Sequence, residues 1–285
     1  MKTLTTEQIE SYRRDGFLLA QAALSATQTQ HYRSSLHAYE AELGAPLTAL
    51  PPMHARKTHV LLPWAAELVR NDAILDVIED LIGPDILVYN ATFFLKEAHT
   101  GDITDWHQDS TYFGLDPHEH VTAWIALSEA SALSGCMEFI PESSTWGQLH
   151  HAAKAVVNSI NLGSQAVVES IDSSVTVVAP LHAGQFSCHN TRTLHRSGPN
   201  MAHDRRIGLG ISYIPTAVRH TGTPRMPATL VRGHDRYGHF DLEPDPRCLT
   251  PAEAKAAHER AYRGYRAGYS EQMQRHAAAY EHKMS

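Results

Sequence analysis

The feature that most constrains the fold is a change of hydrophobic period at Ile86. In the segment ILVYNATFFLK, residues 86–96, apolar residues alternate as they do along a strand with one buried face. The opposite face is mixed, because it carries Asn90, Thr92 and Lys96 beside two apolar residues. A strand with these two faces borders a polar interior or solvent. The apolar face is formed by the alternating residues Leu87, Tyr89, Ala91, Phe93 and Leu95.

Short β-rich segments follow this strand, and Gly, Pro and Asn residues that favour turns separate them. Such a series is typical of an antiparallel barrel or jelly roll. Because helical patterns precede and follow the series, the fold class that we expect is α+β. The segments cover residues 121–127, 136–140, 174–181, 184–190 and 205–214.

Helices are expected on both sides of this β-rich region. Thr5-x-x-Gln8 and Ser25-x-x-Gln28 are capping boxes, and Asn71 is a good N-cap for a third helix that stops at Gly83-Pro84. Thr250-Pro251-x-Glu253 gives similar start signals for a C-terminal helix. With no internal repeat and no linker, we expect a single domain of 285 residues. Its expected parts are a mainly helical stretch (1–84), a β core (85–216) and a C-terminal extension with a helix (217–285).

Charge and composition exclude several classes of protein. Lys and Arg number 24 against 31 Asp and Glu, and no basic run offsets the net charge of −7, so a nucleic-acid partner is not expected. The opening MKTLTTEQIE lacks the apolar stretch of a signal peptide, and no run of about 18 apolar residues could cross a membrane. Three widely spaced cysteines fit reduced thiols. We therefore expect a cytoplasmic protein with a small-molecule substrate and no membrane partner, and the sequence indicates no oligomeric state.

His107 and Asp109 form a His-x-Asp motif, and residues two apart on a strand project from the same face. Alone the motif is a weak signal, because a chain with 20 histidines contains such a tripeptide by chance. A second histidine from a distant strand would place two imidazoles and one carboxylate on one side of a metal ion and leave its other positions open. His195, which lies 88 residues after His107, is the candidate, and His189 in the same presumed hairpin is the alternative.

The strand that begins at Arg206 has one face of small residues. Arg206 belongs to this face, where its guanidinium can hold a carboxylate bidentately. Ser197 lies two residues after His195 and can offer a hydroxyl to the same carboxylate. By the same alternation Arg205 is expected to point outward as a surface charge. The small residues, which we expect to leave room for a ligand, are Gly208, Gly210 and Ser212.

Five segments of the chain, in order, match a known family. They are TTEQIESYRRDGFLL (5–19), WHQD (106–109), TAWIALSEASALSGCMEFIPESS (122–144), LHRSGPN (194–200) and RRIGLGISYIP (205–215). Together they resemble the phytanoyl-CoA dioxygenase family of iron(II)- and 2-oxoglutarate-dependent oxygenases over roughly residues 5–216. Joint occurrence at plausible separations is far more specific than any single segment.

The resemblance implies a fold and a set of site residues. It implies a double-stranded β-helix, a jelly roll of the cupin kind, between N- and C-terminal helices. It also implies that Fe(II) is held by His107, Asp109 and His195, that Arg206 and Ser197 bind the distal carboxylate of 2-oxoglutarate, and that O2 is the second cosubstrate. Halogenases of the family have a small residue in place of the carboxylate, so the presence of Asp109 favours oxygenation.

We therefore expect a dioxygenase that hydroxylates a small polar metabolite and releases succinate and CO2. Trp124, which could also be a core aromatic, and Thr92 are further candidates for cosubstrate binding, and Asn90 and Tyr112 for substrate contacts. The mixed face of residues 86–96 favours a polar or zwitterionic substrate over a long acyl thioester.

Two alternatives remain at this point. A cupin-like metal-dependent hydrolase or isomerase would use the same ligands, because two histidines and an aspartate also suit zinc. Arg206 argues against this alternative, since a hydrolase has no evident need for a carboxylate clamp. The other alternative is a non-catalytic small-molecule-binding protein of the same fold, and an intact set of metal ligands argues against it.

Overall fold

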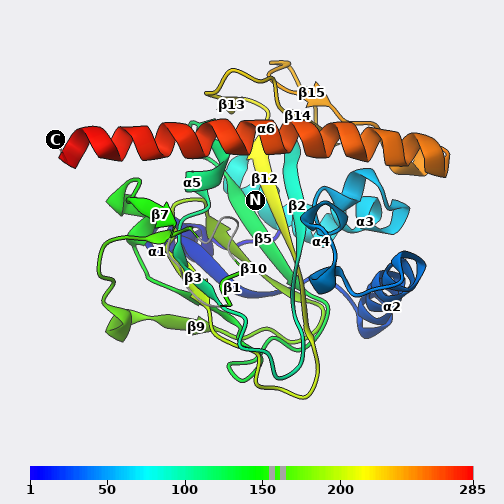
Figure 1. Cartoon of the computed structure of the whole chain (residues 1–285), viewed down its shortest axis with the longest axis horizontal. Coiled ribbons are helices and arrows are strands. Elements are labelled where there is room, and N and C mark those ends of the chain that lie inside the picture. Colours follow the sequence, from blue (N-terminus) through cyan, green and yellow to red (C-terminus); the bar gives the residue numbers. More distant parts are fainter. Residues whose placement is uncertain (154–157, 161–164, 285) are drawn as a thin grey trace.

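A large antiparallel sheet forms the centre of the computed structural model, which describes residues 1–153, 158–160 and 165–284 (Figure 1). Neighbouring strands are antiparallel except for the last pair, β14 and β15. In spatial order the seven strands are β1 (Phe17–Ala22), β10 (Gln185–Asn190), β5 (Val121–Ala126), β12 (Arg206–Pro215), β2 (Ile86–Lys96), β14 (Pro227–Arg232) and β15 (Asp241–Leu242).

A second, four-stranded sheet packs on the inner face of the first. Apolar residues of both sheets, among them Trp124 of β5 and Phe139 of β6, share one buried cluster. This arrangement confirms the expected α+β jelly roll. The four strands are β3 (Thr104–His107), β11 (His195–Ser197), β6 (Met137–Phe139) and β9 (Val177–Ala179), and two small pairs are β4 (Leu115–Asp116) with β13 (Arg219–His220) and β7 (His151–Ala153) with β8 (Gln165–Val167).

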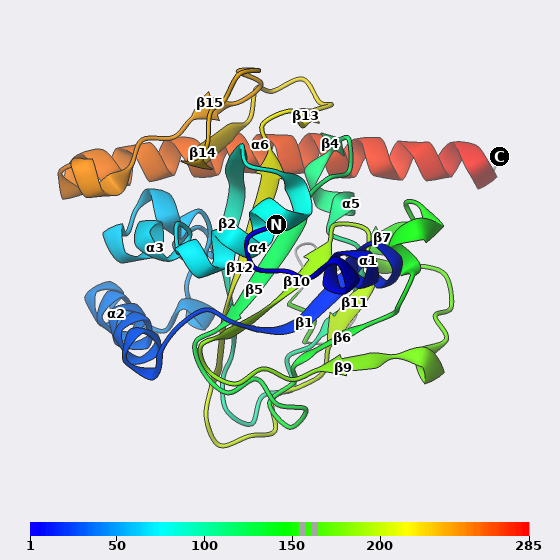
Figure 2. The same cartoon turned by 180° about the vertical axis from the view of Figure 1, so that it is seen from behind.

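Helices cover the outer face of the large sheet, as Figures 1 and 2 show from opposite sides. Both expected capping boxes are present, at Thr5 and Ser25, and Asn71 caps the helix that ends before Gly83. Residues of this helix, such as Ile74 and Ile78, share a buried cluster with the outward residues of β5 and β12. The helices of this N-terminal part are α1 (Thr6–Asp15), α2 (Ala26–Leu43), α3 (Pro63–Leu68) and α4 (Asp72–Ile82).

A bulge in β2 alters the expected alternation of that strand. Ser212 of β12 pairs with Asn90 and Tyr213 pairs with Val88, so Tyr89 is the extra residue. The prediction of one continuous apolar face is therefore wrong for the residues of β2 up to the bulge at Tyr89. Leu87 and Tyr89 lie in a cluster with the C-terminal helix, whereas the rest of the face lies under the N-terminal helices: Ala91, Phe93 and Leu95.

The C-terminal helix α6 (Pro251–Met284) crosses the whole width of the molecule (Figures 1 and 2). Gly264 and Gly268 lie one turn apart, and a Cβ on them would crowd Pro227 and Met226, so these glycines permit the close approach of α6 to the start of β14. Tyr265, between them, is buried in the cluster that also contains Tyr89. The helix therefore contributes to the core and not only to the surface.

A buried ion pair ties the C-terminal extension to the rest of the fold. Lys57 donates to Oε1 of Glu243 at 2.7 Å and to the carbonyl oxygen of Pro227 at 3.0 Å. Thr229 donates its hydroxyl to Oε2 of Glu243 at 2.6 Å. Lys57 is completely buried and the Glu243 side chain is only 3% exposed, so neither charge has access to water.

We expect Glu243→Gln to lower the free energy of unfolding by about 3–5 kcal/mol, because it leaves the Lys57 charge buried and unpaired. Burial by itself would raise the pKa of Glu243, but the Lys57 charge and hydrogen bonds lower it to about 2 from 4.5. The resulting stabilisation, about 3 kcal/mol, is complete above pH 4.5 and is lost as the pH falls through about 2. Denaturant titrations of wild type and variant between pH 7 and pH 3 check this, and equal pH dependence in the two proteins would contradict it.

Among the described residues, no helix has both the length and the apolar character needed to cross a membrane.

Candidate functional site

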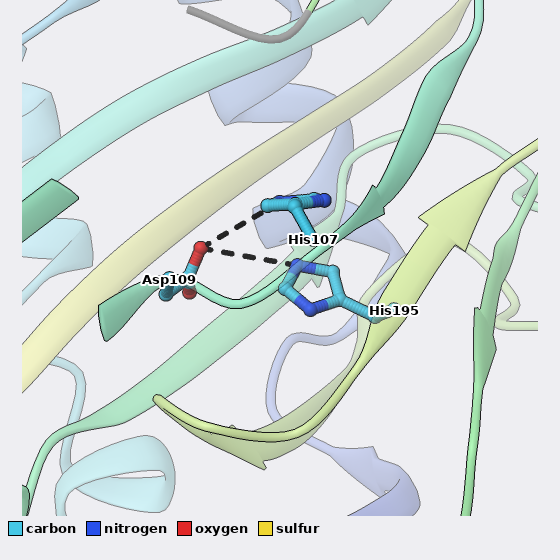
Figure 3. A group of neighbouring side chains, drawn as sticks. All are labelled: His107, Asp109 and His195. Carbon is cyan, nitrogen blue, oxygen red and sulfur yellow. Dashed lines mark ion pairs between the residues drawn. The ribbon is translucent and has the colours of Figure 1, made fainter. Parts of the chain in front are cut away.

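His107 and His195 face each other on neighbouring strands (Figure 3). His107 is the last residue of β3, His195 is the first of β11, and the two residues are direct partners in this antiparallel pair. Their ring centres are 4.0 Å apart, and both side chains are buried. Pairing between the strands thus brings together two imidazoles that are distant in the sequence.

Backbone carbonyl groups determine which nitrogen of each imidazole is available. Nδ1 of His107 lies 2.8 Å from the carbonyl oxygen of Asp105, and Nδ1 of His195 lies 3.0 Å from that of Thr193. Because a carbonyl oxygen can only accept, Nδ1 carries the proton in both neutral rings. The lone pair of each Nε2 is therefore free to bind a metal ion.

Asp109 completes the group, but not through strand alternation. β3 ends at His107, and Asp109 has helical backbone angles at the start of the short helix α5 (Ser110–Phe113). The turn into this helix brings Oδ1 of Asp109 to 3.8 Å from Nε2 of His107 and 3.8 Å from Nε2 of His195. The predicted convergence is present, and its structural reason differs from the predicted one.

The other oxygen of Asp109 is held by residues of the large sheet. Thr122 of β5 donates its hydroxyl to Oδ2 at 2.7 Å, and Nε2 of His189 on β10 lies 3.2 Å from the same oxygen. His189, the alternative ligand in the sequence, thus contacts the carboxylate and belongs to a different sheet from His195. The two oxygens of Asp109 therefore face different partners, and Oδ1 is left to face the histidines.

These three residues fit a divalent metal ion. Burial lowers the pKa of His107 and of His195, so both rings are neutral ligands at neutral pH. Burial by itself would raise the pKa of Asp109, but the His189 hydrogen bond and the nearby imidazoles hold it well below its ordinary value. The three ligand atoms lie within 4.8 Å of one another. Two imidazoles and one carboxylate on one side are typical of non-haem iron(II) sites.

Two cavities meet at this group of ligands. Ser197, Trp124 and Arg206 line the first, and we call it the arginine cavity. Asn90, Thr92 and other residues described below line the second, which we call the outer cavity. The residues that line both are Phe94, Thr104, His107, Asp109 and Thr122.

Arg206 lies in the arginine cavity above the ring of Trp124, with 5.2 Å between the guanidinium carbon and the ring centre. It donates to the carbonyl oxygen of Gly135, and its Nε has no hydrogen-bond partner among the described residues. Burial lowers the pKa of Arg206 to about 10, so the group remains charged at neutral pH. The expected open space over Gly208 is filled, because a Cβ there would overlap the Trp124 ring. The glycine therefore makes room for the wall of the cavity and not for a ligand.

The sequence places Lys96 on the mixed face of its strand but does not predict its position beside Arg206 and Ser197. Lys96 is the cross-strand partner of Arg206 and is completely buried, and its side-chain nitrogen donates to Oγ of Ser197 at 2.6 Å. Burial and the Arg206 charge lower the pKa of Lys96 to about 6. At neutral pH Lys96 is therefore largely uncharged, and the buried charge of this site is that of Arg206. The printed hydrogen bonds of both side chains are to Ser197, Gly198 and Gly135, and none is to an Asp or Glu among the described residues. A buried guanidinium without a carboxylate partner favours the binding of an anion.

Arg205 and Gln108, which adjoin site residues in the sequence, make ion pairs and hydrogen bonds within the fold. Arg205, predicted to be a surface charge, is only 13% exposed and pairs with Glu40 of α2 at 2.6 Å and Glu97 at 2.8 Å. That prediction is wrong because α2 covers this face of β12. Gln108 turns away from the ligands. Its side-chain amide bonds to three backbone groups, and its backbone N–H donates to Nε2 of His151.

The candidate substrate residues lie in the outer cavity. Nδ2 of Asn90 donates to the hydroxyl oxygen of Thr92 at 2.9 Å, and Oδ1 of Asn90 has no hydrogen-bond partner in the described part of the chain. The ring of Tyr112 from α5 lies 6.0 Å from that of His107. Thr92, expected to bind the cosubstrate, lines this cavity and not the arginine cavity. The outer cavity therefore offers hydrogen-bonding groups close to the ligands.

Comparison with protein families gives one match that covers most of the site. The model of the family described as "Phytanoyl-CoA dioxygenase (PhyH)" matches residues 12–208, which is more than half of the chain. This range contains the three candidate ligands and the buried residues Lys96 and Arg206.

Individual relatives are similar over different lengths. The probable alpha-ketoglutarate-dependent hypophosphite dioxygenase of Stutzerimonas stutzeri is 28% identical over 156 residues, 54% of each chain, so the match covers about half of that relative. The L-proline trans-4-hydroxylase of Streptomyces griseoviridis is 28% identical over 239 residues, 76% of this chain and 87% of that one.

A solved structure is similar over nearly the whole molecule. The non-heme monooxygenase ThoJ in its apo form has a TM-score of 0.83 and 29% identity, and the match covers 94% of this chain and 99% of that one. Together with the ligand geometry, these matches show that the chain belongs to the phytanoyl-CoA dioxygenase family of non-haem iron oxygenases that depend on 2-oxoglutarate.

Proposed function

We propose that the protein hydroxylates a small polar metabolite and consumes one 2-oxoglutarate and one O2 for each product. One oxygen atom enters a C–H bond of the substrate as a hydroxyl, the other enters succinate, and the former C1 of 2-oxoglutarate leaves as CO2. The observation that carries the proposal is the position of the His107, Asp109 and His195 group between the arginine cavity, which Arg206 lines, and the outer cavity with its hydrogen-bonding groups.

In this proposal His107 and His195 bind iron(II) through Nε2, and Asp109 binds it through Oδ1. The metal, with 2-oxoglutarate and O2, supplies the oxidising power. Thr122 and His189 hold the other carboxylate oxygen and so keep Asp109 in one orientation. The carbonyl groups that accept from Nδ1 hold the two rings.

Arg206 and Ser197 bind the distal carboxylate of 2-oxoglutarate in the arginine cavity, and Lys96 donates to Oγ of Ser197 from beside this site. A carboxylate there accepts a charge-assisted hydrogen bond from Nε of Arg206, which has no partner among the described residues, and offsets the buried guanidinium charge. Trp124 forms a wall beside the guanidinium. A metal-dependent hydrolase would leave the buried charge of Arg206 without a counter-ion, which favours the oxygenase.

Residues of the outer cavity support a polar substrate. Asn90, Thr92 and Ser212 place hydrogen-bonding groups near the ligands, and Tyr112 and Tyr265 add aromatic walls. The names of two relatives also refer to small polar compounds, hypophosphite and L-proline.

The test is formation of succinate. Protein loaded anaerobically with iron(II) and then supplied with 2-oxoglutarate and oxygen is expected to form succinate slowly alone and faster with its substrate. Mass spectrometry of reactions with polar metabolites and with long-chain acyl-CoA thioesters measures succinate and hydroxylated product. Succinate no higher than in an iron-free control across the panel would refute the oxygenase assignment. Efficient turnover of acyl-CoA alone would refute the polar substrate.

A further inference from the structure

Arg56 is a cation of the outer cavity that no step of the proposed function uses. It follows the short 3-10 helix Pro52–Ala55 and pairs with Thr92 in an isolated bridge. Its carbonyl oxygen lies 2.8 Å from Nε2 of His258 on α6, which fixes its backbone from the other side. Its side chain lines the same cavity as His107 and Asp109, and it does not line the arginine cavity.

The guanidinium of Arg56 has no counter-ion in the described part of the chain. Its NH1 is buried without a hydrogen-bond partner, and no ion pair links it to an Asp or Glu there. Asp109 is the carboxylate of this cavity, and both of its oxygens face other groups.

A second acid lines a hollow that shares Arg56 and Thr92 with the outer cavity. Asp102 lines an adjoining hollow together with Arg56 and Thr92, but it does not form an ion pair with Arg56. By contrast, Arg205 has two carboxylate partners, Glu40 and Glu97. Arg56 is therefore a partly buried cation that faces the reaction site and lacks the anion that would normally accompany it.

We infer that the substrate carries an oxyanion, a carboxylate or a phosphorus oxyanion, and that Arg56 binds it in the outer cavity. This inference rests on the proposed function, since it names the substrate class of the same site. The guanidinium fork matches two oxygens of such a group, and the pairing satisfies the buried NH1. Oδ1 of Asn90 is available in the same cavity to accept from an N–H or O–H group of the substrate.

Binding, rather than turnover, gives the first test. Protein loaded with iron(II) and 2-oxoglutarate under nitrogen is titrated calorimetrically with free amino acids, hydroxy acids, aminophosphonates and hypophosphite. Each carboxylic acid is paired with its primary amide. We expect at least one oxyanion to bind, its neutral counterpart to bind about 30-fold or more weakly, and Arg56→Gln to weaken oxyanion binding by a similar factor. Arg56→Lys should retain part of the affinity, because it keeps the charge but loses the fork.

Matched controls distinguish the loss of the Arg56 contact from unfolding and from a general loss of positive charge. Arg219→Gln removes an exposed arginine that pairs with Asp116 and is expected to leave oxyanion binding unchanged. Unaltered melting temperature and 2-oxoglutarate affinity show that Arg56→Gln is folded. The comparison of each acid with its amide uses the wild-type protein alone, so it does not depend on the folding of any variant. The inference is overturned if no oxyanion binds, if the compounds that bind are neutral or cationic, or if Arg56→Gln binds the oxyanion as tightly as the wild type. Oxyanion binding without succinate formation would refute the proposed function while supporting the role of Arg56.

Discussion

His107→Ala is expected to abolish succinate formation and to weaken iron(II) binding by more than the roughly 10- to 100-fold that loss of an outer partner of a ligand costs. The variant removes one of the three ligand atoms that lie within 4.8 Å of one another and leaves an imidazole and a carboxylate, which bind iron poorly. Anaerobic titration with iron(II) and measurement of succinate give the two values.

Variants of two other histidines give the range of iron affinities against which this result is compared. His182→Ala removes a ring that is 81% exposed and pairs with Glu129, so it should leave iron binding unchanged. His189→Ala removes a hydrogen bond to Oδ2 of Asp109 and should fall between the two, at about a 10- to 100-fold loss. If His107→Ala keeps the iron affinity and activity of the wild type, the ligand assignment is incorrect.

Arg206→Ala is expected to raise the 2-oxoglutarate concentration needed for half-maximal succinate formation by about 30-fold to several thousand-fold, or about 2–5 kcal/mol, with little change in iron affinity. The variant removes the buried guanidinium that lies above the Trp124 ring and leaves the neighbouring Lys96 and Ser197 in place. Titration of 2-oxoglutarate against succinate at saturating iron gives this value.

The control for this variant is a different arginine. Arg205→Ala is unsuitable, since Arg205 forms buried ion pairs with Glu40 and Glu97 and its loss would destabilise the fold. Arg219→Ala, at an exposed position, should leave 2-oxoglutarate use unchanged. An Arg206→Ala protein that uses 2-oxoglutarate as the wild type does would remove the main support for the cosubstrate site.

Local sequence patterns predict those parts of the fold that depend on local interactions. The capping boxes at Thr5 and Ser25 are read correctly because each involves residues three apart. The inward position of Arg206 is also read correctly, because β12 is regular from Arg206 to Ser212. The alternation of β2 fails at Tyr89, because a bulge depends on the register with the partner strand and leaves no signal in a period of two.

The site is predictable where residue type indicates chemistry and unpredictable where position depends on pairing. His107, Asp109 and His195 are recognised by their residue types and by the segments around them. Lys96 and His189 are not, since their roles depend on the strand register that places Lys96 opposite Arg206 and His189 opposite Thr122. A lysine at the end of a strand and a second histidine in a hairpin both have ordinary explanations in the sequence alone.

The course of α6 gives a reason why one chemistry can serve different substrates in this fold. Both histidine ligands and Arg206 belong to the sheets, and Asp109 follows β3 closely, all within the range matched by the family model. Tyr265, by contrast, reaches the outer cavity from a helix beyond that range. His258 near one end and Tyr280 near the other bond to backbone carbonyl groups of Arg56 and Gln148, so the helix is anchored on both sides of Tyr265. Exchange of side chains along this anchored face can reshape the substrate pocket without moving a metal ligand. Selection for a new substrate can thus act on α6 while the oxidising machinery stays the same.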